Sequence, residues 1–435
     1  MSEKNKIAVF EHDRLTTENS SKFLPRHLAA LERFYSQSQI NFFSLIRKGV
    51  KFNQFVGVIQ AGDLTIEVLP KADAESTVND ELKGRWRKVL LQMLRECKIL
   101  KVNRADNANL SLRANSLLEI YFELLLSEVE QLLQNGLVKK YKKCAGNILS
   151  LKGRLDFAKN LAHNAVHQER FYTHYTTYST ENIFNQVVLE AVKLIPKISS
   201  NPLFADRVNR IILNFPELPK CSISEDTFSK LKYDRKTERY REAILISKML
   251  LLNFRPDISG GSDNLISIMF DMNKLWEEFI YRRLKREEEK VRIKVSRQSY
   301  IDFWKPENQK SKAVRPDIVI ESGNRKIVID TKWKTLKDKT PSDQDLKQMF
   351  VYNLFWKCGK SYLLYPGNVE GSGGGNYHCH IYENNFQSSC GIEIIQILSK
   401  DNLLKENLGM EILTKIDLNL EQKLQQHGKM NVISA

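Results

Sequence analysis

The chemistry that this sequence could perform is concentrated in residues 315–334, where three charged side chains flank two short apolar runs. Asp317 precedes the first run, Asp330 and Lys332 follow the second, and a Ser-Gly-Asn turn separates the two. Side chains two positions apart on a strand point to the same face, so Asp330 and Lys332 should project together, with Asp317 alongside across a hairpin. We therefore expect two carboxylates and an ammonium group to converge at one end of a buried hairpin.

Such a group of side chains has a chemical use. Two neighbouring carboxylates repel each other, and a divalent cation between them removes that cost. Mg²⁺ prefers oxygen ligands, so Asp317 and Asp330 are candidate metal ligands, and Lys332 could orient water or stabilise an oxyanion during phosphodiester hydrolysis. A solvated strand edge is the alternative, because a D-x-K tripeptide is common by chance. Its pairing with a second aspartate-bearing strand, in a chain of net charge +15, favours the catalytic interpretation.

A segment upstream offers a further carboxylate. Apolar residues recur at helical spacing from Met272 to Phe279 and predict an amphipathic helix. Glu277 and Glu278 lie at the margins of its apolar stripe, where either could join the metal site or remain solvated. We take Glu277 as the additional catalytic and metal-binding candidate, with the choice between the two glutamates left open.

A segment downstream, SDQDLKQMFVYNLFW, predicts a helix capped at Ser342 or at the next residue. Gln344, Gln348 and Tyr352 follow at four-residue spacing and should share one face of this helix. That face could hydrogen-bond DNA phosphates or could simply face water. Together with Lys334, these three residues are our candidates for contact with DNA.

The sequence pattern divides the chain into three parts and predicts an α+β multidomain fold. Residues 1–75 indicate a β-rich domain that ends in a hairpin, and residues 76–255 a mostly helical domain with one β-leaning interruption. In residues 256–435 helices and strands alternate, which indicates an α/β domain. The segment RPDISGGSDN, with its proline and paired glycines, is typical of a linker and sets the last boundary.

Composition narrows the class of partner. The excess of 67 Lys and Arg over 52 Asp and Glu favours a polyanion, with nucleic acid ahead of a membrane surface. No apolar run approaches the ~18–20 residues that a spanning helix needs, and the N-terminal segment lacks a signal-peptide core, so we expect no membrane contact and a cytoplasmic location. The six cysteines include no Cys-x-x-Cys pair, which predicts reduced thiols rather than a zinc ribbon or disulfides.

Four other segments of the sequence have more than one interpretation. The basic segments 139–143 and 281–298 could follow a DNA backbone, or could be solvated or salt-bridged surface. The His-Cys-His segment at 378–380 has no second ligand pair at finger spacing, which disfavours zinc. The glycine-rich segment 370–376 lacks the Gly-Lys-Ser/Thr of a phosphate-binding loop, so the chain should not hydrolyse nucleotides alone.

The order of these motifs resembles a known family. Pro-Asp followed by Asp-x-Lys, with a glutamate-bearing helix before and Gln-x-x-x-Tyr after, resembles the PD-(D/E)xK nuclease superfamily and its RecB-like branch. The segments at 151–161, 178–195 and 275–284 occur in the same order as in the McrC family, the nuclease subunits of McrBC modification-dependent (type IV) restriction systems. The resemblance extends from about residue 50 to residue 366.

The resemblance implies a Mg²⁺-dependent DNA endonuclease that works with an McrB-like AAA+ GTPase hexamer, which recognises modified, methylated cytosine. Asp317 and Asp330 match the metal ligands and Lys332 the catalytic lysine, on a restriction-endonuclease-like C-terminal domain. The first ~250 residues are then the region that docks into the GTPase and stimulates it. Lys152 and Arg154 could contact the GTPase, although a tight turn between them is the structural alternative.

Two other functions are considered: a non-catalytic DNA-binding adaptor that activates an AAA+ GTPase, and a stand-alone RecB-like repair nuclease. The intact Asp317, Asp330 and Lys332 disfavour the adaptor, and the long N-terminal half disfavours the stand-alone nuclease. One active site nicks one strand, so a double-strand break would need a second copy of the chain on DNA. The sequence does not specify the modified base, its context or the stoichiometry with the GTPase.

Overall fold

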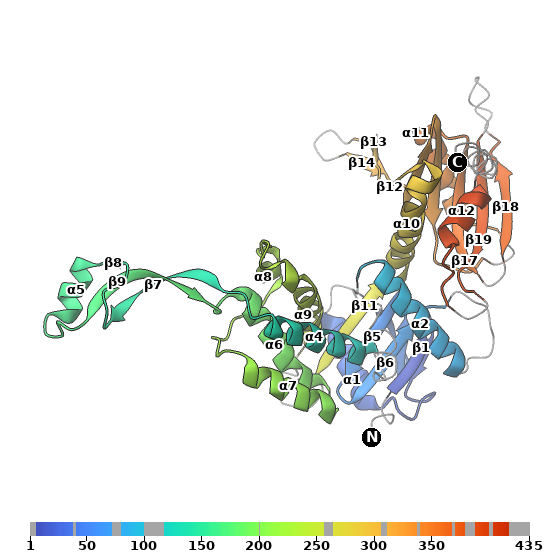
Figure 1. Cartoon of the computed structure of the whole chain (residues 1–435). Helices are drawn as coiled ribbons and strands as arrows, with labels where there is room; N and C mark the ends of the chain where they lie inside the picture. Colours follow the sequence, from blue (N-terminus) through green and yellow to red (C-terminus); the bar gives the residue numbers. More distant parts are fainter. Residues whose placement is uncertain are drawn as a thin grey trace, which may run out of the picture.

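The computed structural model describes residues 6–37, 41–71, 80–99, 117–199, 201–255, 264–305, 311–336, 340–367, 370–378, 388–399 and 403–416. Figure 1 shows an N-terminal lobe built around a sheet, a helical region beside it from which a long narrow arm projects, and a C-terminal lobe. This mixture of helices and sheets in several parts confirms the expected α+β class.

The N-terminal lobe is built on a five-stranded sheet. Its elements are β1 (Lys6–Phe10), β2 (Arg14–Thr16), α1 (Pro25–Gln37), β3 (Phe43–Ile46), β4 (Gly49–Phe52), β5 (Phe55–Ala61), β6 (Leu64–Leu69), β10 (Phe254–Arg255) and β11 (Leu265–Asp271). The strand order is β1-β6-β5-β11-β10, and β2, β4 and β3 form a smaller sheet. The expected hairpin is confirmed as β5 and β6, with Gly62 at the turn in the left-handed region at φ 59°.

Strand β11 requires a correction of the expected domain boundary. The sequence assigned residues 256–435 to the C-terminal domain, but β11 pairs antiparallel with β5 along its whole length. Ile266 and Ile268 pack into one core of this sheet and Leu265 into the other, so burial on both faces holds the strand there. The two backbones approach closely at Gly57, where an added Cβ would lie 2.1 Å from the carbonyl oxygen of Ile268.

The helical region contains α2 (Asp80–Glu96), α4 (Leu117–Gln134), α6 (Ile183–Ile198), α7 (Pro202–Asn214), α8 (Glu225–Ser229), η2 (Glu238–Tyr240) and α9 (Arg241–Asn253). Apolar faces of these helices join one large core. One buried polar group in this core is fully paired: the hydroxyl of Tyr240 accepts from the backbone N–H of Val138 (2.9 Å) and donates to Asn185 (2.7 Å). Most of the segment that the sequence predicts to be helical, residues 76–255, therefore folds into packed helices.

The β-leaning interruption forms the arm, which consists of β7 (Lys140–Ile148), β8 (Arg154–Leu155), α5 (Phe157–Asn164) and β9 (Phe171–Ser179). β7 and β9 pair antiparallel over nine residues and carry the far end of the arm away from the rest of the molecule (Figure 1). Large apolar side chains at that end are exposed to solvent, namely Leu149, Leu151, Phe157 and Leu161. Exposed apolar groups gathered in this way mark a contact surface.

The C-terminal lobe contains α10 (Met272–Val291), β12 (Lys294–Arg297), β13 (Ile301–Trp304), β14 (Lys312–Val314), β15 (Ile318–Ser322), β16 (Arg325–Thr331), α11 (Asp343–Trp356), β17 (Lys360–Gly367), β18 (Gly371–Asn376), β19 (Ser389–Gln396) and α12 (Leu408–Ile416). Six of the strands form one sheet in the order β12-β15-β16-β17-β19-β18, while β13 and β14 pair separately.

Helices cover both faces of this six-stranded sheet. Ile318 and Ile329 pack in the core that contains α10 and α12, whereas Val319 and Val328 pack with α11. Alternate residues of β15 and β16 therefore meet different helices. Burial on both faces explains why these strands read as continuous apolar runs rather than as alternating ones.

The N-terminal and C-terminal lobes share a core. Trp333, which follows β16, packs against Trp276 of α10 with ring centroids 5.3 Å apart, and its indole N–H donates to Glu11 Oε1 at 2.6 Å. Burial raises the pKa of Glu11 to about 7. Arg283 of α10 pairs with Glu96 of α2 at 2.6 Å. These contacts join the strand that carries Asp330 directly to the N-terminal lobe.

Two composition-based expectations can be compared with the structure. Among the described cysteines, Cys97, Cys144, Cys221, Cys358 and Cys390 are free thiols, as expected, while Cys379 lies outside the described residues. The helices of the described ranges include none with the length and apolar character to cross a membrane.

We expect Gly57→Ala to destabilise the protein by roughly 2 kcal/mol, because Gly57 has a φ of 142° and its missing Cβ makes room for β11. The measurement is the apparent midpoint of thermal unfolding of the full chain. Gly84→Ala in α2 is the matched control: no heavy atom lies within 4 Å of its added Cβ, and alanine favours a helix by about 0.5–1 kcal/mol. Equal midpoints for Gly57→Ala and the unmodified chain would contradict the close approach.

Candidate active site

The carboxylates of Asp317 and Asp330 lie at the same end of neighbouring strands. β15 and β16 are antiparallel with Ile318 opposite Ile329, so Asp317 and Asp330 are the next residues on each strand. Asp330 continues the row of Val328 toward α11 and is 1% exposed. The backbone N–H of Lys332 donates to the carbonyl of Leu364 in β17 (2.9 Å), which extends the central pairing past the end of β16.

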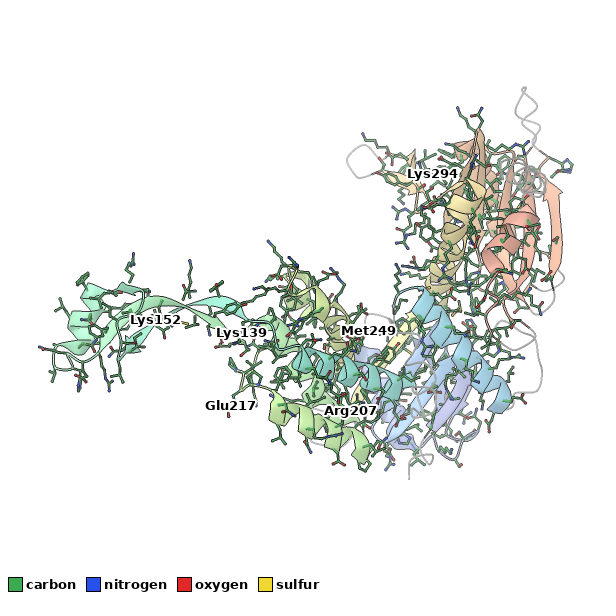
Figure 2. The ribbon with its side chains drawn as sticks, in the orientation of Figure 1. Lys139, Lys152, Arg207, Glu217, Met249 and Lys294 are labelled. Carbon is green, nitrogen blue, oxygen red and sulfur yellow. The ribbon has the colours of Figure 1, made fainter. Side chains whose placement is uncertain are left out.

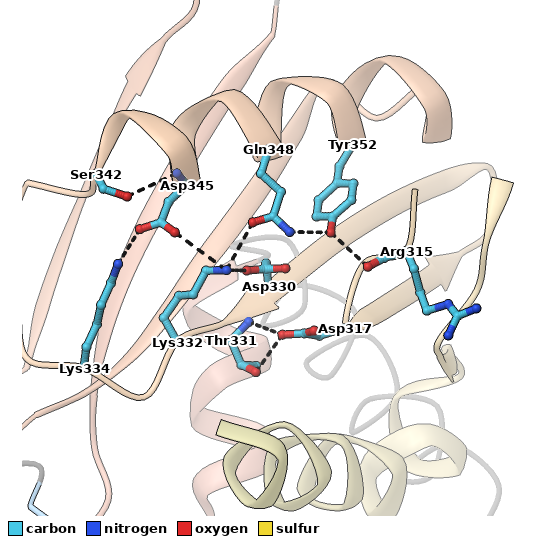
Figure 3. Close-up of polar contacts among 10 residues, drawn as sticks. All are labelled: Arg315, Asp317, Asp330, Thr331, Lys332, Lys334, Ser342, Asp345, Gln348 and Tyr352. Atoms are coloured by element: carbon cyan, nitrogen blue, oxygen red, sulfur yellow. Dashed lines mark hydrogen bonds and ion pairs between the residues drawn. The ribbon is translucent and has the colours of Figure 1, made fainter. Parts of the chain in front are cut away.

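Asp317 is held in place by Thr331. Its Oδ2 accepts from the backbone N–H of Thr331 at 2.7 Å and from the Thr331 hydroxyl at 2.8 Å (Figure 3). Burial nevertheless raises the pKa of Asp317, although the two hydrogen bonds and the charge of Lys332 oppose that rise. Thr331 therefore fixes the orientation of the Asp317 carboxylate, while burial disfavours its ionised form.

Asp330 has a less complete set of partners. The Lys332 ammonium lies 2.6 Å from Asp330 Oδ2, but this ion pair lacks the angles of a hydrogen bond, and the buried oxygen has no hydrogen-bond donor. Burial, and then the charge of Asp317, raise the pKa of Asp330 to about 7, because Lys332 offsets only part of these effects. A buried carboxylate oxygen that faces a cation in this way, with no further donor, is also suited to a metal ion.

Of the two glutamates on α10, the structure favours Glu277. Burial, and then the charges of Asp317 and Asp330, raise the pKa of Glu277 to about 7, so this side chain belongs to the same group of carboxylates. Glu278 is instead occupied by ion pairs with Arg282 and Arg297. The sequence left this choice open, and the ion pairs of Glu278 make Glu277 the better candidate, which stays a prediction.

Several oxygens surround the ammonium group of Lys332 (Figure 3). Besides Asp330, its Nζ donates to Gln348 Oε1 at 3.1 Å and lies 3.7 Å from Asp345 Oδ1. Burial lowers the pKa of Lys332, but the ion pair with Asp330 and the charges of Asp345 and Asp317 together raise it by more. Lys332 therefore remains a cation that is held in one position.

Asp345 was missed by the sequence analysis. It lies in the first turn of α11, where Ser342 caps the helix by accepting from the Asp345 backbone N–H (3.2 Å). Its carboxylate pairs with Lys334 at 2.5 Å as well as facing Lys332. The spacing of three residues from Gln348 could have indicated it, because both side chains then share one face of the helix.

DNA contact by Gln348 and Tyr352 stays a prediction, and in the structure both side chains have partners within the chain. Gln348 accepts from Lys332 through Oε1 and donates from Nε2 to the Tyr352 hydroxyl at 2.7 Å. Tyr352 is 2% exposed and donates to the carbonyl oxygen of Arg315 at 2.9 Å. Both side chains are used internally because this face of α11 packs on the sheet. Gln344 is exposed near the start of α11, outside this network, and Lys334 is paired with Asp345.

The remaining candidates lie away from this group. Lys152 stands far along the arm over the ring of Tyr175 (5.3 Å), and Lys139 lies at the base of the arm (Figure 2). Arg154 is exposed on β8, next to Gly153, whose positive φ fits the expected turn. The segment 370–376 forms strand β18, which pairs with β19, and the residue before it. It does not form a phosphate-binding loop.

Two segments with open alternatives can also be placed. Many charges of segment 281–298 form ion pairs, including Arg282 with Glu278 and Lys285 with Glu288, which favours a salt-bridged surface over a DNA track. His378 is exposed, and Cys379 and His380 lie outside the described residues.

The side chains fit a divalent cation by charge and donor type. Glu277 lies near the buried carboxylates of Asp317 and Asp330, and a single ammonium, that of Lys332, is paired with Asp330. Oxygen donors of this kind suit Mg²⁺. No three His, Cys, Asp or Glu side chains in the described part of the chain form a ready-made metal-binding group, so Mg²⁺ stays a prediction.

Comparisons with known proteins agree with one another. A sequence profile of the family described as "McrBC 5-methylcytosine restriction system component" matches residues 50–366. The chain is similar to the "Type IV methyl-directed restriction enzyme EcoKMcrBC" of Escherichia coli (strain K12), with 22% identity over 288 residues that span 63% of this chain and 80% of that protein.

Two solved structures share the fold. The first is a half-complex from a tetradecameric assembly of Thermococcus gammatolerans McrB AAA+ hexamers with bound McrC (TM-score 0.71, 18% identity, 97% of this chain and 100% of that chain). The second is the cryo-EM structure of the Thermococcus gammatolerans McrBC complex (TM-score 0.53, 18% identity, 65% of this chain and 88% of that chain).

The fold and the site define a multidomain α+β protein whose C-terminal sheet ends in a cluster of carboxylates around a lysine. Because the family profile matches most of the chain, the protein belongs to the family of McrBC 5-methylcytosine restriction system components. The resemblance to the McrC family stated from the sequence is thereby confirmed.

We expect Asp330→Asn to raise the thermal midpoint of the metal-free protein more at pH 8 than at pH 5. The pKa of Asp330 is raised from its ordinary 3.8 to about 7. Between these two values the carboxyl group keeps its proton in the folded state and loses it in the unfolded state. The contribution of Asp330 to the free energy of unfolding of the wild-type protein therefore falls as pH rises from about 4 to 7. At pH 8 the neutral amide of the variant should restore at least about 1 kcal/mol of that free energy. Asp302→Asn, an exposed acid, is the control.

Mg²⁺ should reverse this effect in the wild-type protein. We expect it to raise the midpoint at pH 8, because a bound cation offsets the repulsion among the carboxylates, and to have little effect on Asp330→Asn. The measurement is thermal unfolding with and without Mg²⁺. An equal Mg²⁺-dependent rise in both proteins would place the metal elsewhere.

Proposed function

We propose that the chain is the DNA endonuclease subunit of a GTP-dependent, McrBC-like restriction complex that cleaves DNA containing methylated cytosine by Mg²⁺-dependent phosphodiester hydrolysis. The observation that carries this proposal is the buried pair of Asp317 and Asp330 at one strand end, with Glu277 near both and the ammonium of Lys332 held against Asp330. Membership of the restriction-system family supports the same substrate class. A PD-(D/E)xK assignment of the C-terminal lobe forms part of the proposal.

The chemistry follows from the positions of the side chains. Asp317, Asp330 and Glu277 would hold Mg²⁺, which when bound polarises the phosphate and lowers the pKa of a bound water. Lys332 remains charged beside them and can orient the attacking water or stabilise the developing negative charge on phosphate oxygen. Gln348 and Asp345 limit the positions open to the lysine, which reduces the reorganisation needed for reaction.

The arm and the helical region supply the proposed link to the partner. The solved relative with the higher TM-score contains McrC bound to McrB AAA+ hexamers, and this chain shares its fold along 97% of its length. In the proposal the arm, with Lys152 and Arg154, contacts an equivalent GTPase hexamer and stimulates it. Its exposed apolar end, which includes Phe157 and Leu161, fits a protein contact.

The adaptor and the stand-alone repair nuclease remain the competing functions. Against the adaptor stands the cost of burying Asp330 and Asp317 close together, a cost that a scaffold without catalysis would not need. Against the stand-alone nuclease stand the arm and the helical region, which the site itself does not use. Cleavage of both strands would require a second copy of the chain on the DNA.

The decisive experiment is cleavage of methylated and unmethylated plasmid by the full chain with its cognate McrB-like GTPase, Mg²⁺ and GTP, alongside Asp330→Ala. We expect cleavage that requires methylation, GTP and Asp330. Stimulated GTP turnover without any cut by the native sequence would replace the nuclease with the adaptor. Cleavage that ignores both GTP and methylation would favour the stand-alone nuclease.

A matched pair of variants tests the assignment on α10. Glu277→Gln should lower the cleavage rate by at least about tenfold, because it removes a carboxylate from the proposed metal site. Glu278→Gln changes the neighbouring residue, which is held by Arg282 and Arg297, and should retain most of the activity. The measurement is the rate of plasmid cleavage across Mg²⁺ concentrations. A larger loss for Glu278→Gln would assign the site to the other glutamate.

A further inference from the structure

A small two-stranded unit beside the candidate active site has no role in the proposal so far. It consists of β13 and β14 with the residues that flank them, and we call residues 300–305 and 311–315 the aromatic ribbon. Figure 1 shows β13 and β14 projecting from the C-terminal lobe near β12 and α11. Its inner side is anchored, because Ile301 and Val314 pack against the apolar cluster that contains α11.

Three large rings of the aromatic ribbon are exposed to solvent. Tyr300 is 66% exposed, Phe303 59% and Trp304 54%. Phe303 touches the body of the lobe through Phe355, with ring centroids 5.8 Å apart. Rings with this exposure, on a ribbon held in place from its other side, present a preformed surface for stacking.

Cations accompany the rings. Lys312 is paired across the strands with Trp304 and lies 5.6 Å from its ring centroid, while Arg315 lies 5.9 Å from that of Tyr300. The described ribbon holds three cations, the third being Lys305, against the single acid Asp302. An alternation of aromatic and cationic side chains matches a nucleic-acid strand, which offers bases for stacking and phosphates for ion pairing.

The aromatic ribbon is also tied to the carboxylate site. Arg315 precedes Asp317 by two residues, and its carbonyl oxygen accepts from the Tyr352 hydroxyl (Figure 3). Tyr352 in turn accepts from Gln348, which accepts from Lys332. A phosphate at the carboxylates would therefore have its neighbouring nucleotides within reach of the ribbon.

We propose that the aromatic ribbon is a DNA-binding site that holds the nucleotides next to the cleaved phosphate. Phe303 and Trp304 stack on bases, while Lys312 and Arg315 neutralise phosphates. Stacking does not depend on base identity, so this site grips DNA without reading its sequence. The inference rests on the proposed function for the choice of DNA as the polyanion, and it requires that at least one nucleotide beside the cut be unstacked.

The protein contains its own probe for the test. Of its five tryptophans, Trp86, Trp276, Trp333 and Trp356 are buried, so Trp304 is the exposed one. A short DNA duplex with a single-stranded gap is titrated into the metal-free full chain, where no metal-dependent cleavage can interfere. We expect DNA to quench Trp304 emission and to protect it from acrylamide, with a weaker effect from an ungapped duplex.

Variants separate the ribbon from other basic surfaces. Phe303→Ala and Arg315→Ala should each weaken binding of the gapped DNA by roughly tenfold, measured by fluorescence anisotropy of labelled DNA. Leu213→Ala, which changes an exposed apolar residue on α7, should bind this DNA as tightly as the unmodified chain. Thermal unfolding of each variant distinguishes loss of binding from loss of folding.

Two results would overturn the proposal. One is tight DNA binding with unchanged Trp304 emission and an unaffected Phe303→Ala variant. The other is a change of Trp304 emission on addition of the GTPase alone and none with DNA, which would make the ribbon a protein contact. Absence of plasmid cleavage with intact ribbon binding would instead count against the nuclease proposal and leave this DNA site standing.

Discussion

Strand β16 is subject to two opposing demands, and the C-terminal lobe is organised around them. The strand lies between β15 and β17 with helices over both faces, so its residues must be apolar. Its end, however, carries Asp330 and leads into Lys332, and burying ionised groups is costly unless each is paired. Thr331, Asp345 and Gln348 are arranged so that the charges at this strand end are partly compensated. The compensation stops short of completion, since one oxygen of Asp330 is left without a donor.

The position of the candidate site could be predicted because its signals are local. The apolar runs of β15 and β16, the turn between them and the two-residue spacing of Asp330 and Lys332 are all visible in one short segment. The direction of α11 could not be predicted in the same way. Its apolar residues are distributed around the helix, so no pattern in the sequence placed Tyr352 inside rather than at the surface. Asp345 was overlooked because an acid in the first turn of a helix has an ordinary explanation in capping and the helix dipole.

Pairing between segments far apart in the chain was the other feature that the sequence could not predict. β11 joins β5 about 200 residues earlier in the chain, and a hydrophobic strand gives no local sign of which sheet it will enter. The glycine-marked linker before it pointed to a boundary, whereas the strand after the linker returns to the first sheet. A hydrogen bond such as that between Trp333 and Glu11 is equally invisible in sequence, because it depends on the packing of two lobes. The lobes are better described as one body with a shared core than as separable units.

The junction of β11 and α10 has a mechanical consequence. The strand ends at Asp271, which is also the residue that caps the helix, so no loop separates the N-terminal sheet from α10. The helix has 20 residues and packs along the C-terminal sheet. It spans about 30 Å, so a tilt of about 5° at its base moves its far end by roughly 3 Å. Because the helix continues directly from the strand and the two lobes share a core, the orientation of the N-terminal sheet sets the position of the C-terminal lobe.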